Sequence, residues 1–153
     1  MNVKFKAHNM ENKFEFSIKG IEIVNSIIKA PSEGGTLATF NFDIQFRTIP
    51  NMQENVLTVF ADAVIKDLEK DVQVGQFSAV FHYTVIDLGK VLVKTDGKYL
   101  DVPESLSKTL LGISASTLRG LMFGAFKGTF LHNAILPVID IMAVQPQLIP
   151  LPN

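Results

Sequence analysis

Residues 40–47, Phe-Asn-Phe-Asp-Ile-Gln-Phe-Arg, alternate strictly between large apolar and polar side chains. A period of two places successive side chains on opposite faces of a β-strand, so this stretch predicts a strand with one aromatic face and one polar face. The aromatic face has to be covered by other parts of the protein, whereas the polar face can meet water. The segments around this strand therefore decide the fold.

Three more segments have the composition of strands, namely residues 14–28, 56–68 and 73–87, which are rich in β-branched and aromatic residues. In the first of them the alternation changes phase at Gly20, which predicts a β-bulge. We expect the stretch RTIPNMQEN, residues 47–55, to form a loop. No helix-length segment separates the four strands, so crossover connections are excluded, and an antiparallel meander or a simple variant of it is expected.

One long helix is expected after the strands. Residues 89–100 contain an Asp-Gly pair and form either a hairpin or an excursion over the sheet edge. The helix then begins at Asp-Val-Pro-Glu, with Asp101 as its N-cap and Glu104 at the capping-box position, and its period continues to about Lys127. Its apolar residues form a broad arc, which predicts that the helix is covered on more than one side.

Self-association is expected because one sheet and one helix do not cover this arc. Small residues recur at every fourth position of the helix, namely Gly112, Ser116, Gly120, Gly124 and Gly128. Each interior glycine costs about 0.8–1.0 kcal/mol relative to alanine, so this ridge predicts close contact with another helix. The first strand, expected at a sheet edge, is apolar on both faces. We therefore expect oligomer contacts at Ile21, Ile23, Ser116, Gly120 and Gly124.

Length and composition limit the possible functions. The 153 residues predict a single domain over 1–153, with a core over 13–140 and a proline-containing tail over 141–153. A net charge of −1 provides no basic field for phosphates, which argues against a nucleic-acid partner. The chain has no cysteine. It also has no apolar run of signal-peptide or membrane-spanning length, so we expect a cytoplasmic protein without membrane insertion.

The residues that carry chemistry elsewhere do not form a catalytic arrangement here. His8, His82 and His132 lack the spacing of metal ligands, and Asp62 falls on the less buried face of its strand. The glycines do not form a phosphate-binding loop pattern. We therefore predict neither enzymatic activity nor a cofactor or metal.

From Phe14 to Asp140 the chain resembles the bacterial export chaperone SecB and its relatives. The resemblance is carried by Arg119 in the helix, by Gly-Thr-Phe at 128–130, by the following segment with Leu136, Pro137 and Asp140, and by Ile-Lys-Ala-Pro at 28–31. It implies an α+β fold, with a four-stranded antiparallel sheet and a long helix packed on one face. It also implies dimers formed by pairing of first strands and a homotetramer that is a dimer of dimers. The family's second helix is truncated here, because Pro146, Pro150 and Pro152 interrupt the tail.

The resemblance implies an ATP-independent holdase that binds unfolded or partly folded polypeptides in hydrophobic grooves, for protein export or as a dedicated antitoxin chaperone. We place nine residues in or beside the groove, with ordinary core packing as the alternative for each: Phe40, Phe42, Phe46, Phe77, Phe81, Tyr83, Leu131, Ile135 and Leu136. In the best-known members, acidic residues near the end of the first strand engage the translocase ATPase. Asn25 and Lys29 stand in those places here, so holding clients is better supported than delivery to the translocase.

A small-molecule carrier is the alternative function. In that interpretation the sheet curls around the helix, and the same phenylalanines line a closed cavity for a lipid-like ligand. The small-residue ridge and the apolar first strand favour an oligomeric holdase, because a closed single-chain pocket needs neither. A monomeric mass in solution would favour the carrier.

Overall fold

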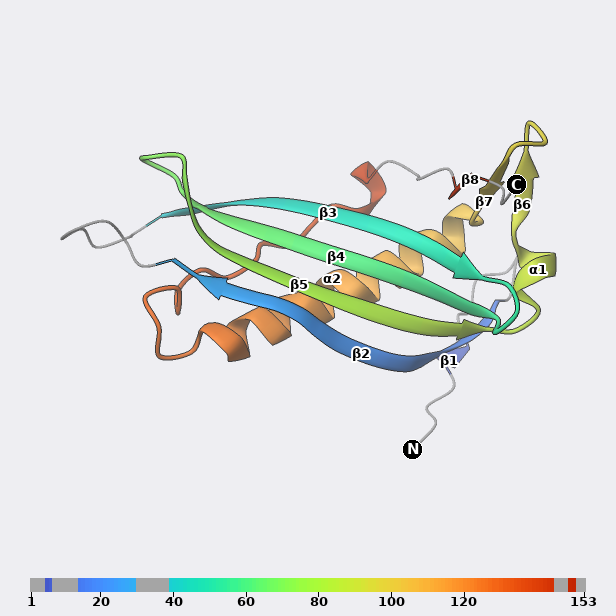
Figure 1. The fold of residues 1–153 in the computed structure, drawn as a ribbon, viewed down its shortest axis with the longest axis horizontal. Coiled ribbons are helices and arrows are strands. Elements are labelled where there is room, and N and C mark those ends of the chain that lie inside the picture. The colour runs from blue at the N-terminus through green and yellow to red at the C-terminus, as the bar shows by residue number, and fades with distance from the viewer. Residues whose placement is uncertain (1–4, 7–13, 30–38, 145–148, 151–153) are drawn as a thin grey trace.

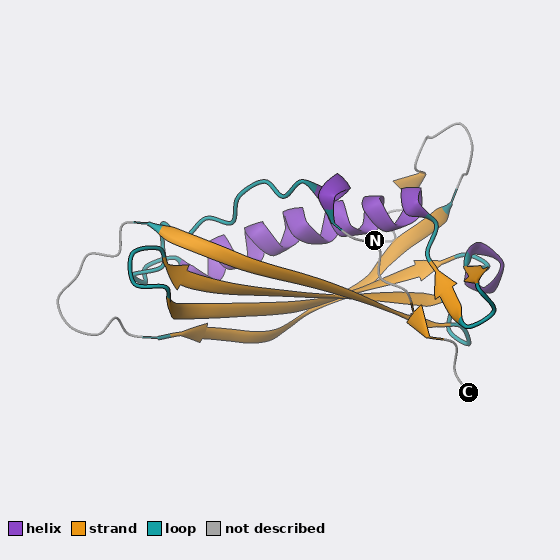
Figure 2. Ribbon diagram, turned by 90° about the horizontal axis from the view of Figure 1, so that it is seen from above, coloured by secondary structure: helices purple, strands orange, loops and turns teal. Residues whose placement is uncertain are grey.

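The computed structural model describes residues 5–6, 14–29, 39–144 and 149–150. It has a twisted five-stranded sheet with a long helix on one face, and a small three-stranded sheet beside it (Figures 1 and 2). The sheet contains β1 (Phe5–Lys6), β2 (Glu15–Ile28), β3 (Phe40–Asn51), β4 (Val56–Asp67) and β5 (Val72–Val85), in the order β1-β2-β5-β4-β3. All neighbouring strands are antiparallel. The predicted α+β class and its four long strands are thereby confirmed. His8, Ala30, Pro31, Pro146 and Pro152 lie outside the described residues.

The strand order is a variant of the meander, and the prediction that excluded crossover connections is wrong, because β5 and β4 lie between the consecutive strands β2 and β3. Strands β3, β4 and β5 follow one another in space, whereas β2 pairs with β5 and so takes the opposite side of the sheet from β3. The register between β2 and β5 shifts between Ile18 and Gly20, where the sequence predicts a bulge. A second shift, between Ile23 and Asn25, has no counterpart in the prediction. Strand β2 is therefore bent twice, while β3 runs without a register shift along β4.

The loop expected over residues 47–55 begins five residues too early, because β3 continues through Pro50 to Asn51. The Leu68 N–H donates to the Thr39 carbonyl at 3.1 Å. This bond shows that the odd-numbered residues of β3 bond β4, so the main-chain groups of the even-numbered residues point away from β4. Proline at position 50 therefore removes no hydrogen bond from the ladder, and the strand continues through it.

The segment after β5 contains a short helix, α1 (Leu88–Val91), and a hairpin of β6 (Val93–Thr95) with β7 (Tyr99–Asp101). Its turn holds Asp96 and Gly97 at positive φ, which confirms the hairpin alternative. Strand β7 also pairs with β8 (Ile149–Pro150). The long helix α2 runs from Glu104 to Phe126, with Pro103 as an N-cap that makes no side-chain bond. The predicted cap at Asp101 is wrong, because Asp101 ends β7 opposite Val93.

The core lies between the sheet and α2. Phe77 of β5 packs edge to face on Phe126 of the helix, with 5.9 Å between the ring centroids. The Tyr83 hydroxyl lies 2.8 Å from Ser114 Oγ, and burial raises the pKa of Tyr83. By length and composition alone, α2 could cross a membrane, but core helices of soluble proteins can have the same length and composition. In this structure α2 is the core helix of the domain.

After α2 the chain turns back along the helix over residues 127–144, which we call the strap (Figures 1 and 2). The strap ends in a short 3₁₀ helix, η1 (Ile141–Ala143). Of the tail, the structure describes only this turn, Val144 and β8, so the truncation of a second helix stays a prediction.

Candidate functional site

The nine predicted groove residues divide into two sets. Five of them, Phe77, Phe81, Tyr83, Leu131 and Leu136, are at most 1% exposed and belong to the core. Their placement in an open groove is therefore corrected. Phe77, Phe81 and Tyr83 lie on the face of β5 that is covered by α2, so their alternation indicates burial against this chain's own helix. Leu131 and Leu136 belong to the strap and join the same core.

The other set lies mainly on β3. Phe40, Phe42 and Phe46 are half-buried and pack against the core from the side of the sheet, together with Ile44. All four residues are even-numbered, so their main-chain groups point to the free side of β3. Among the described residues, β3 has no strand on that side. Main-chain hydrogen-bonding groups and a row of aromatic side chains therefore lie along one edge.

One donor on this edge is already occupied. The Phe42 N–H donates to Oδ1 of the neighbouring Asn41 at 2.9 Å. This bond agrees with the parity argument, because an N–H that bonded β4 would not be available to an adjacent side chain. The Asn41 side chain therefore occupies a main-chain donor near the start of the edge.

The odd-numbered side chains of β3 form its polar face, and they are exposed. Asp43 Oδ2 lies 2.7 Å from Lys66 Nζ, and its hydrogen bond and charge raise the pKa of Lys66. The Arg47 guanidinium lies 4.6 Å from the centroid of the Phe60 ring, a cation–π contact. The edge thus has an acidic and a basic side chain four residues apart.

The strap is attached to α2 through its main chain. Arg119 donates to the carbonyls of Leu136 at 2.8 Å and Pro137 at 3.0 Å. Lys108 donates to the carbonyls of Ile141 at 2.9 Å and Val144 at 2.7 Å. The sequence resemblance singles out Arg119, but no sequence pattern identifies Lys108, because its partners are main-chain atoms more than 30 residues away.

Between and around these anchors the strap exposes apolar side chains. Ile135, Val138 and Met142 are 53%, 87% and 71% exposed, while Leu131, Ala134 and Leu136 are buried. Of the predicted groove residues on the strap, only Ile135 is therefore accessible. The strap covers the core with one set of side chains and presents another set to solvent.

Strand β2 exposes apolar side chains on both faces. Its exposed large residues are Ile18, Ile21, Ile23, Val24, Ile27 and Ile28, with Val24 at 64% and Ile23 at 54%. Strand β1 pairs with β2 only at Glu15 and Phe16, so among the described residues the edge from Ser17 onward has no strand beside it. The predicted interface residues Ile21 and Ile23 lie on this open edge.

The predicted ridge on α2 points away from the sheet. Ser116, Gly120 and Gly124 are exposed, and a Cβ atom added at Gly112, Gly120 or Gly124 would meet no atom within 4 Å. These glycines are thus not needed for packing within the described chain. Packing within the described chain therefore does not explain why small residues recur along this ridge.

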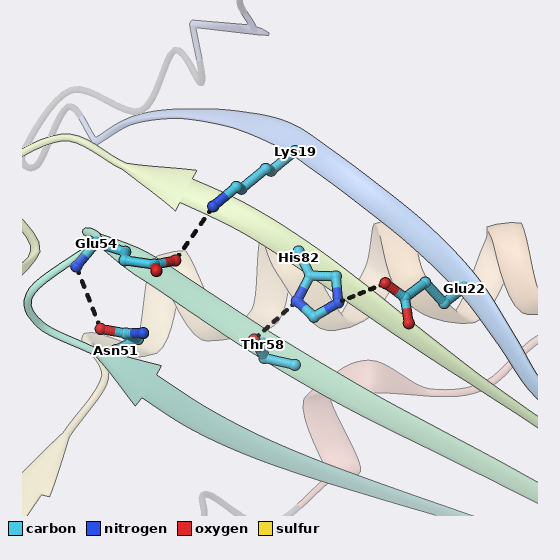
Figure 3. A network of polar contacts seen from close by, with 6 residues as sticks. All are labelled: Lys19, Glu22, Asn51, Glu54, Thr58 and His82. Atoms are coloured by element: carbon cyan, nitrogen blue, oxygen red, sulfur yellow. Dashed lines mark hydrogen bonds and ion pairs between the residues drawn. The ribbon is translucent and has the colours of Figure 1, made fainter.

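The sheet face opposite α2 carries polar contacts that link its strands (Figure 3). His82 Nδ1 lies 3.0 Å from Thr58 Oγ1, and His82 Nε2 lies 3.6 Å from Glu22. Asp62 accepts hydrogen bonds from Gln76 and Ser78 on the same face. Both His82 and Asp62 therefore lie on the polar face, as predicted. No group of three histidine, aspartate or glutamate side chains among the described residues is arranged to hold a metal ion.

Comparison with known proteins finds similarity in structure but not in sequence. No protein-family model matches the sequence, and no curated protein matches it. The fold is similar to a solved SecB-like chaperone of Mycobacterium tuberculosis, in complex with a ChAD peptide from an antitoxin. The two chains are 12% identical, with a TM-score of 0.45 over 82% of this chain and 90% of that chain. The solved structure belongs to the family that the sequence resembles.

Proposed function

We propose that this chain is an ATP-independent holdase chaperone that binds extended, non-native polypeptide at the free edge of β3. One observation carries the proposal: the residues whose main-chain groups face the open edge also form the half-buried phenylalanine row. An added strand would bond the main chain of β3 without regard to client sequence, and its side chains would gain affinity from the phenylalanines. Such binding needs no nucleotide.

The strap supplies further apolar surface in this proposal. Ile135, Val138 and Met142 are large, exposed residues within an eight-residue stretch. When another chain covers apolar groups this close together, they lose contact with water, which favours binding. This contribution to the binding free energy does not depend on the exact sequence of the client. The four main-chain bonds from Arg119 and Lys108 hold this surface in place.

Self-association through the other edge is part of the proposal. A second copy pairing along β2 would cover Ile21, Ile23 and Val24 and leave β3 free for clients. The outward ridge on α2 would supply the second contact of a dimer of dimers. Service to protein export or to one antitoxin, engagement of a translocase and cytoplasmic location stay predictions.

The carrier alternative is not favoured. It requires the strand aromatics to line a cavity, yet Phe77, Phe81 and Tyr83 have almost no accessible surface, either to bulk solvent or to an internal space. Two of the side chains that would hold a ligand contact the helix instead, Phe77 at Phe126 and Tyr83 at Ser114.

The proposal is tested by the suppression of aggregation of a chemically unfolded test protein, followed by light scattering. The double variant Phe42→Ser with Phe46→Ser should lose most of the suppression at the wild-type stoichiometry. Phe60→Ser is the matched control, because Phe60 lies on the opposite face of the sheet and is also partly buried. Far-UV circular dichroism and the unfolding midpoint show whether each variant is folded. Full suppression by a folded double variant would overturn the proposal.

A further inference from the structure

We propose that the β3 edge selects its clients by period and by charge order: extended segments with an apolar residue at every second position and an acidic residue four positions before a basic one. This inference rests on the proposed function of the same edge. It adds what kind of polypeptide segment the edge prefers.

The period follows from the parity of β3. The even-numbered residues direct both their main-chain groups to the free edge and their side chains to the face covered by α2. A client residue bonded to Phe42 or Ile44 therefore places its side chain directly beside that residue, on the same face. The next client residue lies on the polar face, beside Asp43 or Gln45. A client with apolar residues on consecutive positions would expose half of them to water.

The length of the preferred segment follows from the row itself. The strict alternation of β3 places apolar side chains from Phe40 to Phe46 on one face and polar ones from Asn41 to Arg47 on the other, and it ends at Thr48 and Ile49. At about 3.3 Å per residue, the row is about 20 Å long. A matching client therefore spans about eight residues, four of them apolar.

The charge order follows from Asp43 and Arg47, which are both exposed on the polar face of the edge. The Asp43 side chain keeps 55% of its surface exposed despite its contact with Lys66. A client base beside Asp43 and a client acid beside Arg47 would each add a favourable cross-strand pair. Antiparallel pairing is the arrangement of the whole sheet and is the more stable per residue. Because such a client runs opposite to β3, its acidic residue comes first.

The test uses three N-terminally fluorescein-labelled, C-terminally amidated peptides of one composition, measured by fluorescence anisotropy at low salt. The first is Glu-Val-Thr-Val-Lys-Val-Thr-Val, which has the proposed period and charge order. The second exchanges its Glu and Lys. The third, Glu-Thr-Val-Val-Lys-Thr-Val-Val, keeps the charges in place and breaks the period.

We expect the broken-period peptide to bind at least about tenfold more weakly than the first, because two of its four valines lie on the polar face. The exchanged peptide should bind about three- to tenfold more weakly. In the variant Arg47→Glu, each of these two charge orders has one matched and one opposed pair, so the difference between them should disappear. That loss would tie the charge preference to this edge.

The remaining outcomes separate the two proposals. Equal binding of all three peptides would overturn the selection by period and charge and leave the holdase function standing. Tighter binding of the exchanged peptide would overturn the charge order and indicate parallel pairing. Absence of binding by all three would overturn both the selection and the proposed client edge.

Discussion

The two open sides of the sheet differ in what they expose. Strand β2 presents six large aliphatic residues on both faces and is bent by two register shifts. Strand β3 has a regular register, one aromatic face and one polar face, and its single strongly exposed large apolar residue is Ile49. An edge that is apolar on both faces aggregates unless it is permanently covered, whereas a half-polar edge can remain open. This difference supports the proposal that β2 serves self-association and that β3 serves exchangeable clients.

The bulges strengthen this distinction. Two copies of the same bent strand can pair about a two-fold axis, because residue i of one copy then contacts residue j of the other and residue j contacts residue i, so one register shift of each copy can face the other shift of its partner. A client of arbitrary sequence has no such bulges, so it fits a regular strand better. Strand β3 is the only one of the two that offers an uninterrupted run of paired positions.

The largest expected effect separates core from edge. Phe81→Ala should reduce the free energy of unfolding by about 3–5 kcal/mol, because Phe81 is fully buried under α2. Phe42→Ala should cost only about 1–2 kcal/mol, because its ring is half-exposed. Urea unfolding of both variants measures the difference. Equal costs would show that the β3 phenylalanines are core residues and would remove them from the client edge.

The next effect concerns the assembly. The double variant Ile23→Lys with Val24→Lys places charges on both faces of the β2 edge and should weaken self-association by about a hundredfold or more. Light scattering over a dilution series reports the mass. Ile49→Lys on β3 is the matched control, since Ile49 is 44% exposed, and its mass should follow the wild type. If Ile49→Lys dissociates the assembly and the β2 variant does not, the assignment of the two edges is reversed.

A third effect tests how firmly the β2 side is held to the core. Tyr83 packs against Phe16 of β2 and contacts Ser114 of α2. Tyr83→Phe should cost about 1–2 kcal/mol at neutral pH, because Ser114 loses a buried partner.

The same variant has a pH signature. Burial raises the pKa of Tyr83, so its neutral form stabilises the fold below the unfolded tyrosine pKa of about 10, and this contribution is lost as the pH rises above that value. Tyr83→Phe should therefore lose less stability than the wild type above pH 10, measured by denaturant unfolding at several pH values. If the wild type and Tyr83→Phe lost stability equally above pH 10, burial would not raise the pKa of Tyr83, and this prediction would be wrong.

The sequence predicts the strands well because their alternation is local, and the position of His82 and Asp62 on the polar face follows from it. The choice between core and groove for Phe77 and Phe81 cannot be made this way, because both environments require the same apolar period. Pairing of β2 with β5 depends on contacts 47 to 69 residues apart in the chain, from Ile28–Gly75 to Phe16–Val85. The hydrogen bonds of Lys108 to main-chain carbonyls could not be predicted for the same reason. The N-cap at Pro103 could not be predicted either, because Asp101 pairs with Val93 in the hairpin instead of capping α2.

A smaller effect concerns the ridge on α2. Gly120→Ala should raise the stability of the dissociated chain by about 0.5–1 kcal/mol, because the added methyl group meets open space and the helix gains propensity. Gly120→Leu should fit the single chain equally well but reduce a tetramer to dimers if helices approach there. Thermal unfolding and sedimentation measure the two quantities. Wild-type mass for Gly120→Leu would remove the ridge as an interface.

The smallest effect sharpens the comparison at the β3 edge itself. The Asn41 side chain occupies the Phe42 N–H, a donor that an added strand would use. Asn41→Ala leaves this donor free, so an alternating peptide should bind about two- to fourfold more tightly to the variant, since it no longer displaces an existing hydrogen bond. Gln45→Ala is the control, because Gln45 shares the polar face of β3 and no contact with the Phe42 N–H is expected of it. The same peptide titration followed by anisotropy measures both. Weaker binding by Asn41→Ala alone would mean that Asn41 contacts the client, and unchanged binding would mean that the added strand does not use the Phe42 donor.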